Sequence, residues 1–367
     1  MPNRRDALSL LVAAAMAGAS TPAKAQAGRL RDAFAAKGVL FGVFVSHELI
    51  GGYLQDPDYL KLVSAQAGLI AGEHGTSPYT LWQDATTPNF TGLDRELFFA
   101  QSNQLPYYGW LLWNDWVPDW LQKSSPAETR KFMERHFEVI MKRDAGRARY
   151  WQVVNEPIWV ENGLKNGMRD GPYSRAMPGD EYIKWAFKRA REMAPKARLV
   201  LSEAHLERAD RYGRLQRPAF LALLDRLLDA GTPIDAVALQ GHVLSYAPDA
   251  GYASDGVREV VDHIAKRKLG VIISEFDVDD RTFPNDIPER DRRVAEAAGK
   301  FLRDVFSTKK PELFISFGMS DKFTWMKSIK AHQDVAAYRK PRPLPFDEAM
   351  RPKLLRDMMV ERLAELA

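Results

Sequence analysis

The 367-residue sequence contains no cysteine, which excludes thiol nucleophiles, cysteine-ligated zinc and iron–sulfur clusters. Its seven histidines are scattered, without a His-x-x-x-His or His-x-His pair, and this disfavours a metal-dependent hydrolase. No Gly-x-Gly-x-x-Gly follows the first apolar run, so a dinucleotide site is also disfavoured. These absences lead us to predict neither a metal ion nor a cofactor.

Long hydrophobic runs are also lacking, and the N-terminal one has the features of an export signal. Arg4 and Arg5 precede a short apolar run at 7–19, and small residues surround the lysine of the AKA motif at 23–25. The run is too short to span a membrane. The paired arginines favour the twin-arginine pathway over the general secretory one. Residues 1–25 are predicted to be a cleaved twin-arginine signal peptide of a periplasmic or secreted protein.

The charge balance gives no indication of a nucleic-acid partner. The whole chain carries a formal net charge of +4, and residues 1–25 account for +2 of it. The basic runs KRK at 266–268 and ERDRR at 289–293 are predicted to lie on solvated helix faces. Apolar residues make up 46% of the chain, enough for a sizeable core without disulfide bonds. We expect a monomer with no membrane span.

Short apolar runs and amphipathic stretches alternate along the rest of the chain. The runs lie at 40–45, 67–73, 107–113, 149–155, 198–203, 236–241, 270–277 and 313–318. They are mostly continuous, as in strands covered on both faces. The helical stretches include 125–143, 178–194, 217–231, 291–307 and 347–365. This alternation predicts an α/β fold, a single-domain (β/α)8 TIM barrel over residues 28–367, with an open doubly wound sheet as the alternative.

Two of the predicted strands end in carboxylates. The fourth ends in Asn155 and Glu156, and the seventh carries Glu275 and Asp277. The carboxyl ends of barrel strands share one rim, so the two glutamates are expected to face each other across a cleft. Retaining glycosidases need such a pair, roughly 5–5.5 Å apart, as nucleophile and acid/base. The alternative is that each carboxylate caps a following helix, which two similar strand ends make less attractive.

Tryptophans are concentrated near these strand ends. Trp151 and Trp159 flank Glu156 in the sequence, and apolar neighbours would raise the pKa of a catalytic acid by desolvation. Trp113 and Trp325 are expected to line the cleft, where sugar faces stack on aromatic rings. Two others lie in helical patterns and are predicted to pack in the core, namely Trp120 and Trp185.

Five motifs, in order along residues 35–365, resemble those of glycoside hydrolase family 10, the endo-β-1,4-xylanase family. WQVVNE resembles the acid/base motif, ISEFDV the nucleophile motif, and LQGH at 239–242 the Gln-x-His motif. FGMSDKFTW at 317–325 and KPRPLPFDEAMRPK at 340–353 resemble the two motifs after the last strand. The resemblance implies a secreted retaining β-glycoside hydrolase that cleaves a β-linked polysaccharide or oligosaccharide by double displacement.

The resemblance also implies roles for individual residues. Glu156 would be the acid/base and Glu275 the nucleophile, while His242 would orient Glu275. Asn155 could hydrogen-bond a sugar 2-hydroxyl, a contact that strengthens in the transition state. Two alternatives stay open. Asp277 belongs either to a hydrogen-bond network at the site or to the cap of the next helix, and His242 could be a plain core histidine. The predicted substrate-binding residues are Glu73, Trp113, Asn114, Gln240 and Trp325.

The chain departs from the family where the family binds the non-reducing side of xylan. His74 replaces an asparagine after Glu73, and no lysine follows it. Gly109 and Asn114 occupy the places of two histidines on the third strand, and SEAH at 202–205 replaces Asn-Asp-Tyr-Asn. Changed polar groups imply a changed sugar, such as a bacterial exopolysaccharide or a β-glucan. A non-catalytic saccharide-binding barrel is a further alternative, which the retention of both glutamates disfavours.

Overall fold

The computed structural model describes residues 28–161, 163–164, 167–244, 251–328 and 340–366. The predicted export signal at 1–25 lies outside these residues and stays a prediction. The strands are β1 (Leu40–Val45), β2 (Leu69–Gly72), β3 (Tyr107–Trp113), β4 (Ala148–Asn155), β5 (Arg198–Glu203), β6 (Ala236–Leu239), β7 (His242–Val243), β8 (Gly270–Val278) and β9 (Leu313–Ser316).

The helices fill the intervals between the strands. They are α1 (Leu30–Ala36), α2 (His47–Gly51), α3 (Pro57–Gln66), α4 (Pro78–Leu81), α5 (Thr91–Ser102), α6 (Asp119–Gln122), α7 (Pro126–Asp144), α8 (Pro172–Ala176), α9 (Glu181–Met193), α10 (Arg211–Asp229), α11 (Ser254–Lys266), α12 (Ile287–Thr308) and α14 (Leu354–Glu365), with 3-10 helices η1 (Asp321–Phe323) and η2 (Trp325–Ser328). Among the helices of the described ranges, none is long and apolar enough to cross a membrane.

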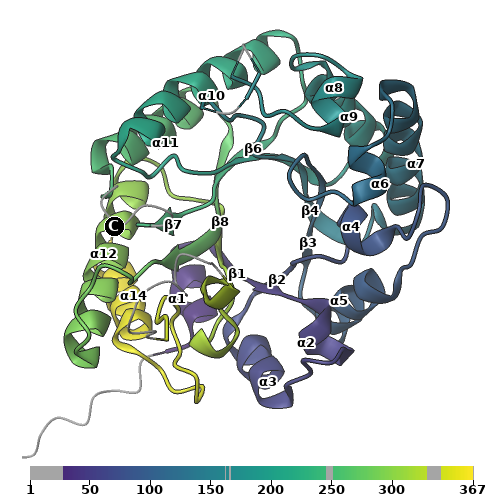
Figure 1. The fold of residues 1–367 in the computed structure, drawn as a ribbon. Helices are drawn as coiled ribbons and strands as arrows, with labels where there is room; N and C mark the ends of the chain where they lie inside the picture. Colours follow the sequence, from purple (N-terminus) through teal and green to yellow (C-terminus); the bar gives the residue numbers. More distant parts are fainter. Residues whose placement is uncertain (1–27, 162, 165–166, 245–250, 329–339, 367) are drawn as a thin grey trace, which may run out of the picture.

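Eight parallel strands close into a barrel. β1 to β6 pair in chain order, β8 and β9 follow, and the β6–β8 and β1–β9 pairings complete the ring. The helices surround this ring, as Figure 1 shows in a view along the barrel. The two-residue β7 is an extra strand that pairs with β8. The predicted (β/α)8 barrel is confirmed, and closure excludes the open doubly wound sheet.

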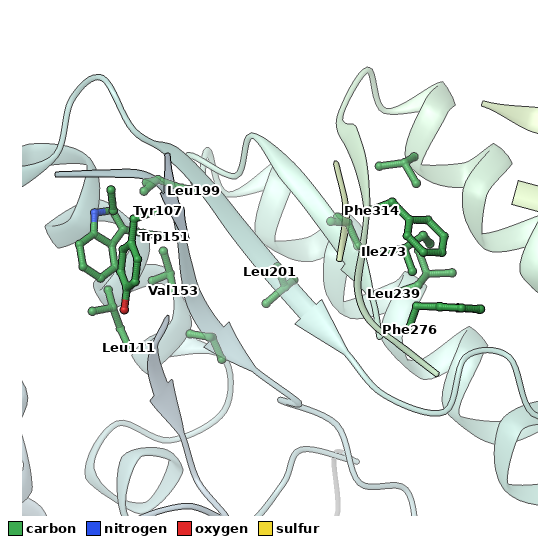
Figure 2. Packing of buried hydrophobic residues seen from close by; sticks show 14 of the residues in the cluster. Tyr107, Leu111, Trp151, Val153, Leu199, Leu201, Leu239, Ile273, Phe276 and Phe314 are labelled. Atoms are coloured by element: carbon green, nitrogen blue, oxygen red, sulfur yellow. The ribbon is translucent and has the colours of Figure 1, made fainter. Parts of the chain in front are cut away.

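The strand side chains form two apolar layers. The buried residues of the inner layer all come from barrel strands and include Phe44, Tyr108 and Ile272. The outer layer joins the strands to the helices, and Figure 2 shows part of it around Trp151 and Phe314. Because the strands are covered on both faces, they appear in the sequence as continuous rather than alternating apolar runs.

Several helix boundaries follow the local sequence. α7 begins with a capping box, in which the Ser125 side chain accepts from the Glu128 N–H and the Glu128 carboxylate accepts from the Ser125 N–H. α10 starts six residues before the predicted position, because Asp210 caps it and Pro218 is accommodated inside the helix. The predicted last helix, 347–365, begins only at Leu354.

The predicted sixth strand, 236–241, is broken in two. β6 ends at Leu239, Gly241 has a φ of +81°, and β7 starts at His242. A positive φ is readily adopted by glycine, which has no Cβ. The break places Gln240 and His242 at the carboxyl end of the barrel, where both face the same cavity.

Candidate active site

A cavity of about 670 Å³ lies at the carboxyl ends of the barrel strands. Strand ends and the loops that follow them supply its lining. The predicted site residues in that lining are Glu73, Trp113, Asn155, Glu156, Gln240, His242, Glu275 and Trp325. Glu156 and Glu275 thus share one rim, as predicted from the two strand ends.

An irregularity in β8 turns Glu275 toward the cavity. Ile272 lies in the inner layer and Ile273 in the outer one, so simple alternation would place residue 275 outside. The register between β8 and β9 shifts between Ile273 and Phe276, and Phe276 joins the outer layer instead. Such irregularities are frequent beside active sites, because they re-aim a side chain.

A chain of hydrogen bonds supports Glu275. His242 Nε2 lies 3.3 Å from Glu275 Oε2, and His242 Nδ1 lies 2.8 Å from Asp277 Oδ1. Trp325 Nε1 donates to the other oxygen of Asp277 at 2.7 Å. Burial opposes protonation of His242, but Asp277 and Glu275 outweigh it and raise the His242 pKa well above its usual value. Both ring nitrogens of His242 thus lie within hydrogen-bond distance of a carboxylate oxygen.

This geometry settles two alternatives that the sequence left open. Asp277 is fully buried and bonded to His242 and Trp325, whereas the next long helix, α12, is capped by Asp286. Asp277 therefore belongs to the network around the site and is not a helix cap. His242 is likewise not an isolated core histidine.

Glu156 is held by three N–H donors. Its Oε1 accepts from Gln240 Nε2 at 2.7 Å, and its Oε2 accepts from Trp113 Nε1 at 3.1 Å and from Arg169 Nη2 at 2.9 Å. Burial raises the pKa of Glu156 above its usual value, while Arg169 and Gln240 oppose that shift and Glu275 adds to it. Glu156 adopts a φ of +48°, an unusual backbone conformation for a non-glycine residue.

Only one of the two tryptophans expected beside Glu156 lies in the cavity wall. Trp151 is fully buried in the outer layer and does not line the cavity, because its strand position points toward the helices. Trp159 does line the cavity, and the guanidinium of Arg169 lies over its ring at 4.1 Å. The ring that contacts the Glu156 carboxylate is Trp113.

Asn114 was predicted to bind substrate, but the structure places it outside the cavity lining. Its side chain is almost fully buried, and its Oδ1 accepts from the N–H of Tyr173 at 3.1 Å. Asn114 therefore fixes the first turn of α8. The following residue, Asp115, lines the cavity instead.

Gly109 also lies away from the cavity, although it stands where the family has a histidine. A Cβ built on Gly109 would come within 2.6 Å of the Trp151 ring, which shows that this position faces the outer layer. The neighbouring Trp110 lines the cavity and donates from Nε1 to the main-chain oxygen of Glu73 at 2.9 Å. An aromatic ring therefore occupies the wall at this point of β3.

Replacing Gly109 with alanine is expected to destabilise the fold by about 1–3 kcal/mol, because the new methyl group overlaps the Trp151 ring. Thermal unfolding followed by circular dichroism measures the change. Gly146→Ala is the matched control, since a Cβ there meets no atom within 4 Å. Equal melting temperatures for the two variants would contradict the placement of Gly109.

Aromatic rings also stack beside Glu156. Trp116 lies parallel to Trp113 with 6.1 Å between ring centroids, and to His74 with 5.5 Å. Tyr79 contacts Trp116 from the solvent side and is largely exposed. Trp120 and Trp185, by contrast, pack against the outer layer as predicted.

Two supporting residues of Glu156 were not singled out from the sequence. Arg169 carries no motif signal, because it lies in the irregular segment between β4 and α8. Glu203 ends β5 and was detectable by the same strand-end reasoning that identified Glu156. Glu203 is fully buried, burial raises its pKa to about 8, and its oxygens accept from the N–H groups of Ile158 and Ala204. It therefore fixes the backbone that follows Glu156.

A closed (β/α)8 barrel with one glutamate directly after β4 and another near the carboxyl end of β8, both in one cavity, is the architecture of a glycoside hydrolase. The chain belongs to glycosyl hydrolase family 10, whose family model matches residues 29–362. Within the described part of the chain, no group of three His, Cys, Asp or Glu residues is placed to hold a metal ion.

Individual relatives agree with this assignment. Endo-1,4-beta-xylanase C of Paenibacillus barcinonensis is 30% identical over 286 residues, which cover 71% of this chain and 25% of that protein. Endo-1,4-beta-xylanase A of Cellvibrio japonicus is 27% identical over 303 residues, covering 75% of this chain and 47% of that protein. The chain thus spans a quarter and about half of these two relatives.

The fold agreement extends to solved structures. The crystal structure of xylanase 10B from Thermotoga petrophila, in complex with xylobiose, superposes with a TM-score of 0.78. The match covers 92% of this chain and 97% of that chain at 20% sequence identity. At this identity the similarity establishes the shared barrel fold.

Proposed function

We propose that the protein is a retaining, xylanase-like β-glycanase that cleaves its substrate by double displacement. The observation that carries this proposal is the pair of glutamates in one cavity with different hydrogen-bond partners. Glu275 attacks the anomeric carbon while Glu156 protonates the departing oxygen. Glu156 then removes a proton from the water that releases the glycosyl group from Glu275.

The surroundings of the two carboxyl groups fit these separate tasks. His242, fixed on its other side by Asp277, aims one oxygen of Glu275, which is a positional contribution to the attack. Glu156 is buried and its pKa is raised, as a group that must hold a proton requires. Asn155 lines the cavity beside Glu156 and is in position to contact a sugar hydroxyl.

A β-linked glycan other than unsubstituted xylan is the substrate that we favour. The relatives are endo-xylanases by name, but the cavity wall near Glu73 here includes the rings of Trp110, Trp113 and His74. Trp116, which is not part of the lining, stacks on the His74 ring. Rings in that wall offer stacking surface and few hydrogen-bond partners. We also propose, from the N-terminal arginine pair and apolar run, that the enzyme acts outside the cytoplasm.

Reducing ends released from a panel of β-linked polysaccharides test this function. We expect cleavage of at least one glucan, exopolysaccharide or decorated xylan. On unsubstituted xylan we expect kcat/KM to be at least roughly fivefold lower than on the preferred polymer, since one lost polar contact costs about 1 kcal/mol or more. A chelator should have no effect. Release from none of the polymers would support the non-catalytic saccharide-binding barrel instead. Preferred cleavage of unsubstituted xylan would contradict the claim that the aromatic wall near Glu73 disfavours this substrate.

A further inference from the structure

Arg169 makes an unusually complete set of contacts around Glu156. Its Nη2 donates to Glu156 Oε2 at 2.9 Å, and its Nε donates to the Glu156 main-chain oxygen at 2.7 Å. Its Nη1 forms an ion pair with Asp115. The guanidinium also lies over the Trp159 ring, and only 2% of Arg169 is exposed. One buried side chain therefore fixes both the backbone and the carboxylate of Glu156.

These contacts oppose one half of the proposed reaction. Arg169, Trp113 and Gln240 all donate N–H groups to the Glu156 carboxylate, and each favours its ionised form. An ionised Glu156 is the base needed for the second step. The first step needs a protonated Glu156. If Arg169 lowered the Glu156 pKa further, it would impair the acid role.

Other groups near Glu156 offset the lowering of its pKa by Arg169. Burial raises the Glu156 pKa, Arg169 lowers it, and Glu275 and Asp115 raise it again. Glu203 and Tyr212 are further titratable groups that interact electrostatically with Glu156. Asp115 forms an ion pair with Arg169, and its negative charge raises the Glu156 pKa, so Asp115 counteracts the effect of the guanidinium on Glu156.

We propose that Arg169 is a positioning residue for Glu156 and that Asp115 is the counterion that keeps Arg169 from suppressing proton donation. This inference rests on the proposed acid/base role of Glu156. Arg169 holds Oε2 in place through both steps. Asp115 neutralises part of the Arg169 charge, so that one carboxyl group serves as acid and then as base.

Opposite shifts of the pH–rate profile in two variants test the proposal. The profile is kcat/KM for phenyl β-xylobioside and phenyl β-cellobioside, whose poor leaving group requires the acid. Its alkaline limb reports loss of the Glu156 proton in the free enzyme. Arg169→Gln removes the main influence that lowers the Glu156 pKa, so this limb should move up by about one pH unit. Asp115→Asn leaves Arg169 unbalanced, so the limb should move down by about half a unit.

Further variants separate positioning from a structural role. Arg169→Lys keeps the charge and should keep the alkaline limb closer to wild type than Arg169→Gln does. Arg175→Gln removes a positive charge from the neighbouring helix α8, where Arg175 forms an ion pair with Asp170 and a hydrogen bond with Gln122, and should leave the profile unchanged. Should Arg169→Gln fail to fold, Asp115→Asn still provides the test, because 42% of the Asp115 side chain is exposed.

The outcomes distinguish this inference from the proposed function. A wild-type protein that hydrolyses no glycoside removes the function and the inference together. A wild-type protein that is active, with an alkaline limb that stays in place or moves in the same direction in Arg169→Gln and Asp115→Asn, overturns the inference alone. Opposite shifts with an unchanged acid limb support it.

Discussion

Replacing Glu275 with alanine is expected to abolish glycosidic cleavage, with kcat lower by on the order of 10⁵-fold or more, as for the loss of other covalent nucleophiles. Without the carboxylate, no glycosyl–enzyme intermediate can form. The loss should be similar for good and poor leaving groups, because the missing group acts on the anomeric carbon. Steady-state hydrolysis of 2,4-dinitrophenyl and phenyl glycosides measures both cases.

Added azide or formate should restore slow turnover in the Glu275→Ala variant. The small anion enters the space left by the carboxylate and attacks from the same face, giving a product of inverted anomeric configuration. Glu275→Gln, which keeps the side-chain volume, should remain inactive with azide and is the matched control. Substantial residual activity without azide, or a rescued product of retained configuration, would contradict the nucleophile assignment.

Replacing Glu156 with alanine is expected to affect substrates according to their leaving groups. Phenyl glycosides should lose roughly 10²–10⁴-fold in kcat/KM, because the departing oxygen is no longer protonated. The 2,4-dinitrophenyl glycosides should retain nearly full kcat/KM, since their leaving group needs little protonation. Breakdown of the intermediate should still slow, because the same residue acts as the base in the second step.

A burst of dinitrophenol followed by a slow steady state is the expected kinetic signature of Glu156→Ala. Azide should accelerate the slow phase, because this anion needs no base to attack the intermediate, and should give a glycosyl azide of retained configuration. The same response to leaving group and azide in the Glu156 and Glu275 variants would refute the division of roles.

The barrel was predictable because its strands are covered on both faces. Eight continuous apolar runs separated by amphipathic stretches allow few other arrangements. Short-range signals also identified several boundaries, such as the capping box that opens α7. The start of α10 was predicted too late, because the helix begins at Arg211 and contains Pro218, which lacks an N–H group. The break between β6 and β7 depends on the conformation of Gly241, which the apolar pattern does not record.

The structure brings into one cavity most of the predicted site residues that lie within short motifs at strand ends, and their roles stay predictions. The direction of other side chains was not predicted. The Trp151 side chain packs in the outer layer and not in the cavity wall, and Asn114 bonds to the start of α8. Strand register and local irregularities control these directions, and the sequence gives no direct record of either.

The support of Glu156 by Arg169 and Asp115 was not predictable from local pattern. These two residues are 54 positions apart in the chain and meet only because the loops after β3 and β4 are neighbours. Neither lies in one of the five motifs that resemble the family. Contacts of this kind follow from the closed barrel, which brings adjacent loops to one rim.

Covalent trapping of the intermediate tests the central assignment most directly. The reagent is a 2,4-dinitrophenyl 2-deoxy-2-fluoro β-glycoside. Its fluorine slows both steps, and its good leaving group speeds the first one, so that the glycosyl–enzyme accumulates. Intact-mass measurement followed by peptide mapping should find one glycosyl group per chain, attached to Glu275 in the peptide that contains ISEFDV. Attachment to Glu156 or to another residue, or an active enzyme that yields inverted product and no adduct, would contradict the account.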